Sequence, residues 1–151
     1  MTILEMNGLT GPGFVLGHRV TPLPSPETFS LLEVVTDPGV AGPPMHHHPD
    51  FSEFFYICEG TLDVLLSGGR KRLDARMGLS IGPGVAHSFI NPGDRAVRFI
   101  TGFSPRGFEA FFEAARIPAH EPAAQKRSMA ADRLEWVARH GRSFGMIICE
   151  D

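Results

Sequence analysis

The chain has few of the features that mark secreted, membrane or nucleic-acid-binding proteins. It has only two cysteines, Cys58 and Cys149, and they form no paired-spacing motif, so we expect free thiols in a reducing compartment. The net charge of −3 gives no electrostatic reason to expect nucleic acid or an anionic membrane as a partner. No apolar run approaches a bilayer span, and residues 1–10 show no signal pattern. We therefore predict a cytoplasmic protein.

Glycine and proline, by contrast, are plentiful. The 17 glycines and 13 prolines separate short apolar runs, which is typical of an all-β domain with many tight turns. The length suits one domain, which we place at residues 1–151. The predicted strands cover residues 29–36, 53–58, 62–66, 70–73, 78–81, 87–91 and 96–103, with a short edge strand at 14–16.

The pattern becomes helical in the C-terminal extension, at about residues 105–151. A second helix there fits residues 130–140, with Leu134 and Val137 on its buried face and Gly141 just past its end. We expect the two helices to cover the β-domain. The first helix is predicted from apolar residues at helical spacing before a terminating proline: Phe108, Phe111, Phe112, Ala115 and then Pro118.

Candidate metal ligands gather where a histidine run leads into a strand. Alternation along an extended chain places His46 and His48 on one face and His47 on the other. Glu53 opens the next apolar run, and His87 heads a later strand after a turn. Imidazoles and a carboxylate suit a divalent first-row metal. A histidine run alone could also be a solvated cluster, and His87 alone an interior histidine, so the prediction rests on their joint spacing.

This spacing resembles the two sequence motifs of the cupins. The first motif is H-x-H, three or four residues, Glu, six residues and Gly, and it is matched by His46, His48, Glu53 and Gly60. The second motif ends P-x-G-x-x-H-x-x-x-N, and it is matched by Gly84, His87 and Asn91, with Gly82 in the place of the proline. The likeness covers about residues 30–103. The remainder is similar to small single-domain cupins described as quercetin 2,3-dioxygenase-like.

The resemblance implies a double-stranded β-helix barrel, or jelly roll, with one divalent transition metal near its mouth. The metal would be Fe, Ni, Mn, Co or Zn, held by His46, His48, Glu53 and His87 with at least one position left open. Single cupins of this type are commonly homodimers, so a homodimer is expected. The partner would be a small-molecule substrate or ligand.

The resemblance also suggests a reaction, in which O₂ is used on an aromatic or enolisable small molecule. Glu53 would then act as the general base, as in similar flavonol dioxygenases. Phe55, Ile57 and Phe89 share strand faces with the ligands and are expected to line an apolar pocket. Two alternatives remain open: a metal-assisted isomerisation, cyclisation or lyase step without O₂, and a ligand-binding module without catalysis.

Two other polar groups are interpreted as surface features. The basic cluster of Arg70, Lys71, Arg72 and Arg76 follows a tight turn beside acidic residues, which predicts a solvated hairpin and not an anion site. The remaining histidines in or near Pro/Gly-rich segments or a helix end are expected at the surface: His18, His120 and His140.

Overall fold

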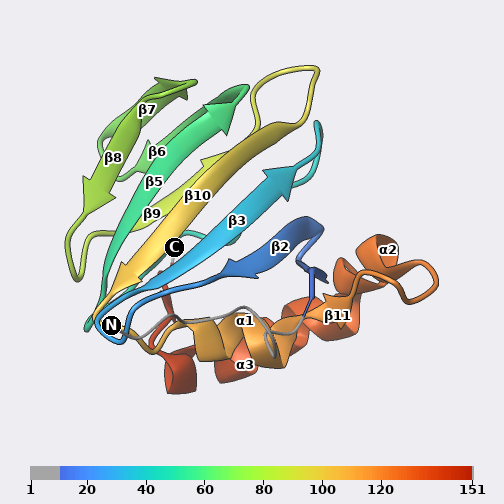
Figure 1. The fold of residues 1–151 in the computed structure, drawn as a ribbon. Helices are drawn as coiled ribbons and strands as arrows, with labels where there is room; N and C mark the ends of the chain where they lie inside the picture. Colours follow the sequence, from blue (N-terminus) through green and yellow to red (C-terminus); the bar gives the residue numbers. More distant parts are fainter. Residues whose placement is uncertain (1–10, 151) are drawn as a thin grey trace, which may run out of the picture.

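A computed structural model describes residues 11–150, so the prediction about a signal pattern in residues 1–10 lies outside it. Two antiparallel sheets face each other (Figure 1). The seven-stranded sheet contains, in spatial order, β11 (Ile117–Pro118), β1 (Gly13–Val15), β2 (His18–Leu23), β3 (Ser30–Thr36), β10 (Val97–Ser104), β5 (Ser52–Glu59) and β8 (Gly78–Ile81). The five-stranded sheet contains β12 (Ile147–Ile148), β4 (His46–His47), β9 (His87–Ile90), β6 (Thr61–Leu66) and β7 (Gly69–Asp74).

Alternating burial along the strands builds the core between the two sheets. Leu32 and Val34 are buried on β3, and Phe55 and Ile57 are buried on β5, whereas Tyr56 between them is 42% exposed. The predicted all-β barrel is thereby confirmed, because each inner face is apolar and each outer face is polar or half-buried. Within the described part of the chain, no helix is long and apolar enough to cross a membrane.

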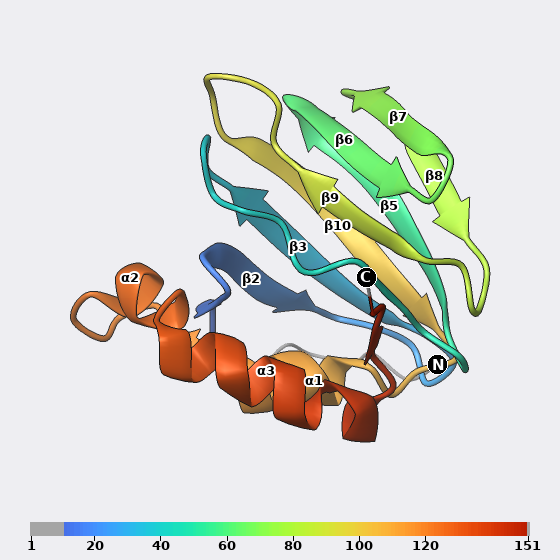
Figure 2. The same cartoon turned by 180° about the vertical axis from the view of Figure 1, so that it is seen from behind.

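Three helices follow the barrel strands, and two of them are the predicted ones. They are α1 (Glu109–Ala115), α2 (Ala124–Ser128) and α3 (Ala131–Phe144). Helices α1 and α3 lie side by side and cover the barrel on the side of β2 (Figures 1 and 2). The chain then returns to the second sheet, where β12 pairs with β4.

The end of the second helix differs from the prediction. Gly141 lies inside α3, and the helix ends at Gly145, whose φ of 91° is left-handed. A Cβ at Gly141 would lie 3.0 Å from the Cε atom of Met146, so this glycine serves close packing and not termination. Leu134 was predicted to be buried but is 50% exposed. It lies before Trp136, where the contacts of α3 with α1 begin.

Strand β2 was not predicted, because it contains Pro22. Proline lacks an N–H and is tolerated where one side of a strand has no partner. β1 pairs with the first half of β2, up to Val20, so among residues 11–150 Pro22 pairs with β3 alone. The two-residue strands and α2 were also missed, because segments this short carry no periodic signal.

The basic cluster lies on the β6–β7 hairpin, where its charge is partly neutralised. Arg72 and Arg70 donate hydrogen bonds to the buried carboxylate of Asp63, at 2.9 and 3.0 Å. The Arg72 guanidinium lowers the pKa of Asp63 more than burial raises it, and Arg70 adds to this effect. The side chains of Arg70 and Arg72 are 58% and 60% exposed, as expected for a solvated hairpin.

Candidate metal centre

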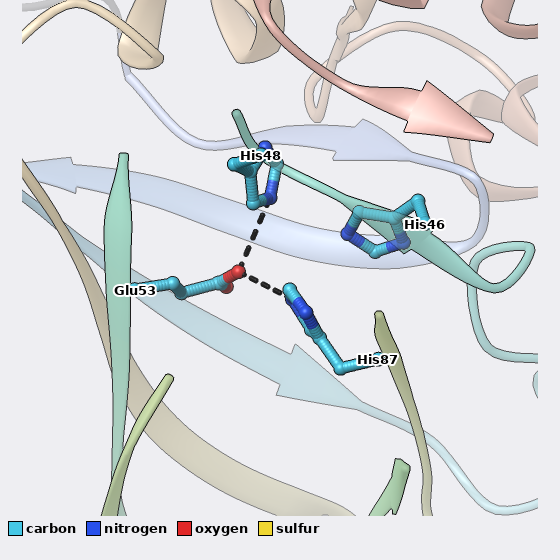
Figure 3. A group of neighbouring side chains, drawn as sticks. All are labelled: His46, His48, Glu53 and His87. Atoms are coloured by element: carbon cyan, nitrogen blue, oxygen red, sulfur yellow. Dashed lines mark hydrogen bonds and ion pairs between the residues drawn. The ribbon is translucent and has the colours of Figure 1, made fainter. Parts of the chain in front are cut away.

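Four side chains from separate segments converge at one end of the barrel interior. His46 lies on β4 and His48 just beyond it, while Glu53 lies on β5 and His87 on β9. Their ligand atoms all lie within 4.8 Å of one another, and all four residues are buried (Figure 3). His47 is half-buried, and its Nδ1 atom lies 4.0 Å from the Cys149 sulfur. The structure thus brings together the four residues that the motif spacing indicates, without His47.

Backbone carbonyls fix the orientation of all three imidazoles. A carbonyl oxygen only accepts hydrogen bonds, so each Nδ1 atom carries the proton and each Nε2 atom keeps a free lone pair. Neutral imidazoles with Nε2 lone pairs directed at one point are suited to bind a metal ion. The three bonds run from His46 to Pro44 (2.7 Å), from His48 to Gly145 (2.9 Å) and from His87 to Val85 (2.9 Å).

The carboxylate of Glu53 lies against these nitrogens. Its Oε2 atom is 2.7 Å from the Nε2 atom of His87 and 3.3 Å from that of His48. Two facing lone pairs at such distances repel each other unless a cation lies between them. A proton on His87 Nε2 would relieve the repulsion for one pair only. The buried Nε2 atom of His48 has no hydrogen-bond partner in the described part of the chain. A divalent cation would satisfy both, so the residues fit a metal.

Burial and the close contacts within the cluster also shift the pKa values of its members. Burial raises the pKa of Glu53, but its close contacts with His48 and His87 together outweigh this effect and lower the pKa to about 2. Burial, followed by the charge of His87, lowers the pKa of His46 to about 4. Burial lowers the pKa of His87, but the nearby carboxylate of Glu53 outweighs this effect, so the net shift of the His87 pKa is upward. At neutral pH the site therefore offers an ionised carboxylate and a neutral His46.

Thr101 contacts the candidate ligand Glu53, although the motif spacing did not indicate it. Its hydroxyl donates to Glu53 Oε1 at 2.8 Å, which turns the other carboxylate oxygen toward the histidines. Thr101 is opposite Phe55 in the β10–β5 register and is buried. A sequence signal existed: Thr101 is the one polar residue among the alternating inward positions of β10, which are otherwise Val97, Phe99 and Phe103.

Replacing Thr101 with valine is expected to weaken metal binding by about 10- to 100-fold, as is typical when a group that orients a ligand is lost. Valine keeps the shape but leaves Glu53 Oε1 without its donor. Metal titration of the apoprotein measures the change, and thermal unfolding monitors the fold. Thr21→Val is the control, because Thr21 lies on β2 outside the cavity. Equal metal affinities in both variants would contradict this role.

An apolar cavity of about 60 Å³ adjoins the four ligands. Phe55 and Phe89 line it, as expected, together with Phe99 and Phe103. Ile57 does not line it, which corrects the prediction. It is fully buried on the same face of β5, but at this level of the sheet Phe99, its partner on β10, lines the cavity instead. Sharing a face therefore did not place it at the cavity.

Comparison with known proteins agrees with this geometry. The Cupin domain family matches residues 32–103. A protein named polyketide synthase CurC, from Streptomyces cyaneus, is 42% identical over 60 residues, which is 40% of this chain and 39% of that protein. The match therefore covers well under half of that relative.

Solved structures share the fold at low sequence identity. KdgF from Halomonas sp. superposes with a TM-score of 0.61 and 18% identity, over 72% of this chain and 99% of that one. A sugar phosphate isomerase of the cupin superfamily from Silicibacter pomeroyi superposes with a TM-score of 0.57 and 18% identity, over 70% of this chain and 77% of that one. A deletion mutant of the Bacillus subtilis oxalate decarboxylase OxdC superposes with a TM-score of 0.54 and 22% identity, over 64% of this chain and 28% of that one. Residues 32–103 therefore form a cupin domain, and the solved structures share its fold.

Proposed function

We propose that this protein is a metal-dependent enzyme that uses O₂ to oxidise a small enolisable or phenolic molecule. The observation that carries the proposal is the buried cluster of three histidines and one glutamate, which faces an apolar cavity. Four protein ligands leave one or two positions on a five- or six-coordinate ion, and an open position is what a catalytic metal site needs.

The residues of the cluster would hold Fe, Ni, Mn, Co or Zn in its divalent form through three Nε2 atoms and Glu53 Oε2. When bound, such an ion polarises a substrate oxygen and, if it is redox-active, supplies electrons for a reaction with O₂. Glu53 is ionised and can accept the substrate proton, although a pKa of about 2 makes it a weak base. The apolar wall formed by Phe55, Phe89 and Phe103 excludes water.

The cavity volume limits which part of a substrate enters. An apolar cavity of about 150 Å³ is enough to hold benzene, whereas this one measures about 60 Å³. An aromatic ring therefore enters only if wall side chains move, and Phe108, Phe112 and Met146 form the wall on the side of the helices. A smaller enolisable head group needs less movement.

A second candidate reaction is isomerisation or cyclisation without O₂. The polyketide synthase relative favours it, because polyketide chains carry carbonyl groups on alternate carbons and enolise readily. The same cluster would then polarise a carbonyl, and Glu53 would move a proton between carbons.

One experiment separates these functions. Untagged protein is loaded in turn with Fe(II), Ni(II), Mn(II), Co(II) or Zn(II) and mixed with a 1,3-diketone or a flavonol. We expect O₂ uptake that matches substrate loss with a redox-active metal and none with Zn(II), because Zn(II) has no redox chemistry. Product formed without O₂ uptake would support the isomerase. Tight ligand binding without turnover under any metal would overturn both and favour a ligand-binding module.

A further inference from the structure

His18 is buried inside the barrel, although it was predicted to lie at the surface. It is the first residue of β2, whose burial alternates so that His18 and Val20 point inward while Arg19 between them is exposed. Only 5% of His18 is exposed. The glycine beside it ends the tight β1–β2 turn, and the inward position follows from pairing of His18 with Val15.

Within the described part of the chain, one nitrogen of the His18 ring makes a hydrogen bond. Its Nδ1 atom lies 2.9 Å from the hydroxyl of Thr36, and its ring centre lies 5.0 Å from that of Phe89. Burial lowers the pKa of His18 to about 4, although the Ala41 carbonyl partly offsets this, so the ring is neutral at pH 7. Its Nε2 atom is buried and has no hydrogen-bond partner among residues 11–150.

The cavity beside the candidate metal centre is also lined by His18. Its wall includes His46, His48, Glu53 and His87, and apart from Thr101 the other lining side chains are apolar. A buried polar atom without a partner costs free energy, which a bound ligand recovers if it supplies the missing hydrogen bond. A histidine that served only the core would have both ring nitrogens paired.

We infer that His18 is a specificity-determining residue, which binds a hydroxyl group on a substrate whose first oxygen lies at the four-residue cluster. The inference rests on the proposed function, and it narrows the substrate class to enols or phenols with a second hydroxyl. A hydroxyl both donates and accepts, so it pairs with Nε2 whichever nitrogen of His18 carries the proton. A carbonyl oxygen pairs with only one of these two forms.

The test compares ligands that differ by one hydroxyl. Zn(II)-loaded protein, which does not turn over O₂, is titrated calorimetrically with 1,3- and 1,4-dihydroxybenzene and with 3- and 4-methylphenol. Each methylphenol has almost the same shape as its dihydroxybenzene partner. We expect at least one dihydroxybenzene to bind about tenfold more tightly than its methyl partner, as a buried hydrogen bond predicts.

Two variants assign this preference to His18. In His18→Leu the ratio of affinities should fall to about one, whereas His18→Gln, which keeps a polar atom near the Nε2 position, should retain part of it. Val34→Ala is the control, because Val34 lines the same cavity without a polar group and should leave the ratio unchanged. Thermal unfolding with and without Zn(II) verifies that each variant folds and binds metal.

The outcomes that contradict the inference are distinguishable. A hydroxyl preference of the same size in wild type and His18→Leu would overturn the role of His18 and leave the proposed function standing. The absence of any hydroxyl preference in wild type would likewise overturn the role of His18 and leave the proposed function standing. If none of the four probes bound to protein that holds Zn(II), phenols would be excluded as the substrate class of the proposed function, and the inference about His18 would be rejected with it.

Discussion

Replacing His87 with alanine is expected to lower the metal content of untagged protein from about one ion per chain to almost none. The variant removes one of three converging Nε2 atoms and the partner closest to Glu53, at 2.7 Å. Loss of a group that merely orients a ligand weakens binding by about 10- to 100-fold, so loss of a ligand should cost at least as much. Elemental analysis after dialysis measures the change.

His48→Ala should give the same result, because the Nε2 atom of His48 is also directed into the cluster and has no hydrogen-bond partner among the residues that the structure describes. His47→Ala is the matched control from the same histidine run, since His47 lies outside the cluster. Metal content that stayed unchanged in both His48→Ala and His87→Ala would show that the ion binds elsewhere. A loss in His47→Ala equal to that in His48→Ala would point to a surface cluster.

Phe108→Ala should destabilise the protein by about 3–5 kcal/mol, as is typical when a buried phenylalanine is truncated. Phe108 is 2% exposed. Its ring centre lies 4.4 Å from that of His48 and 4.6 Å from that of Phe103, so it joins α1 to the metal centre and to β10. For a chain of this size we expect the unfolding temperature to fall by roughly 10 °C.

Leu134→Ala is the control for this prediction, because Leu134 is an apolar residue of the helical extension that is 50% exposed. Its stability should change by no more than about 0.5 kcal/mol. Phe108→Ala should also loosen the packing that holds the His48 ring, so its metal affinity should fall while that of Leu134→Ala stays constant. Equal unfolding temperatures for the two variants would contradict the packing described for α1.

The barrel could be predicted from the sequence because its longer strands are short apolar runs bounded by turn residues. Within these runs Leu32 and Val34, like Phe55 and Ile57, alternate with half-buried or exposed residues, as the period of a strand requires. Helix α3 shows the limit of such patterns. Gly141 has the right type and place for a helix end, but the left-handed conformation belongs to Gly145. Only packing against Met146 explains why residue 141 is small.

The candidate metal ligands could be predicted because they lie at fixed spacings near strand ends. The residues that support them could not, because they come from distant parts of the chain. Thr101 reaches Glu53 from β10, and His18 enters the cavity from a segment whose prolines hid a strand. The prediction for Ile57 was wrong for a simpler reason: alternation gives the face of a strand but not which side chains on that face reach a cavity.

The hydrogen bond from His48 to the Gly145 carbonyl has a consequence for how the site is assembled. All four candidate ligands are synthesised by residue 87, yet the acceptor that orients His48 follows 97 residues after it. Strand β12, which pairs with β4 beside His46, comes later still. On the ribosome, the imidazole of His48 is therefore oriented only after Gly145 has been synthesised. Binding of a metal at these four residues would then depend on folding of the segment that contains α3 and β12.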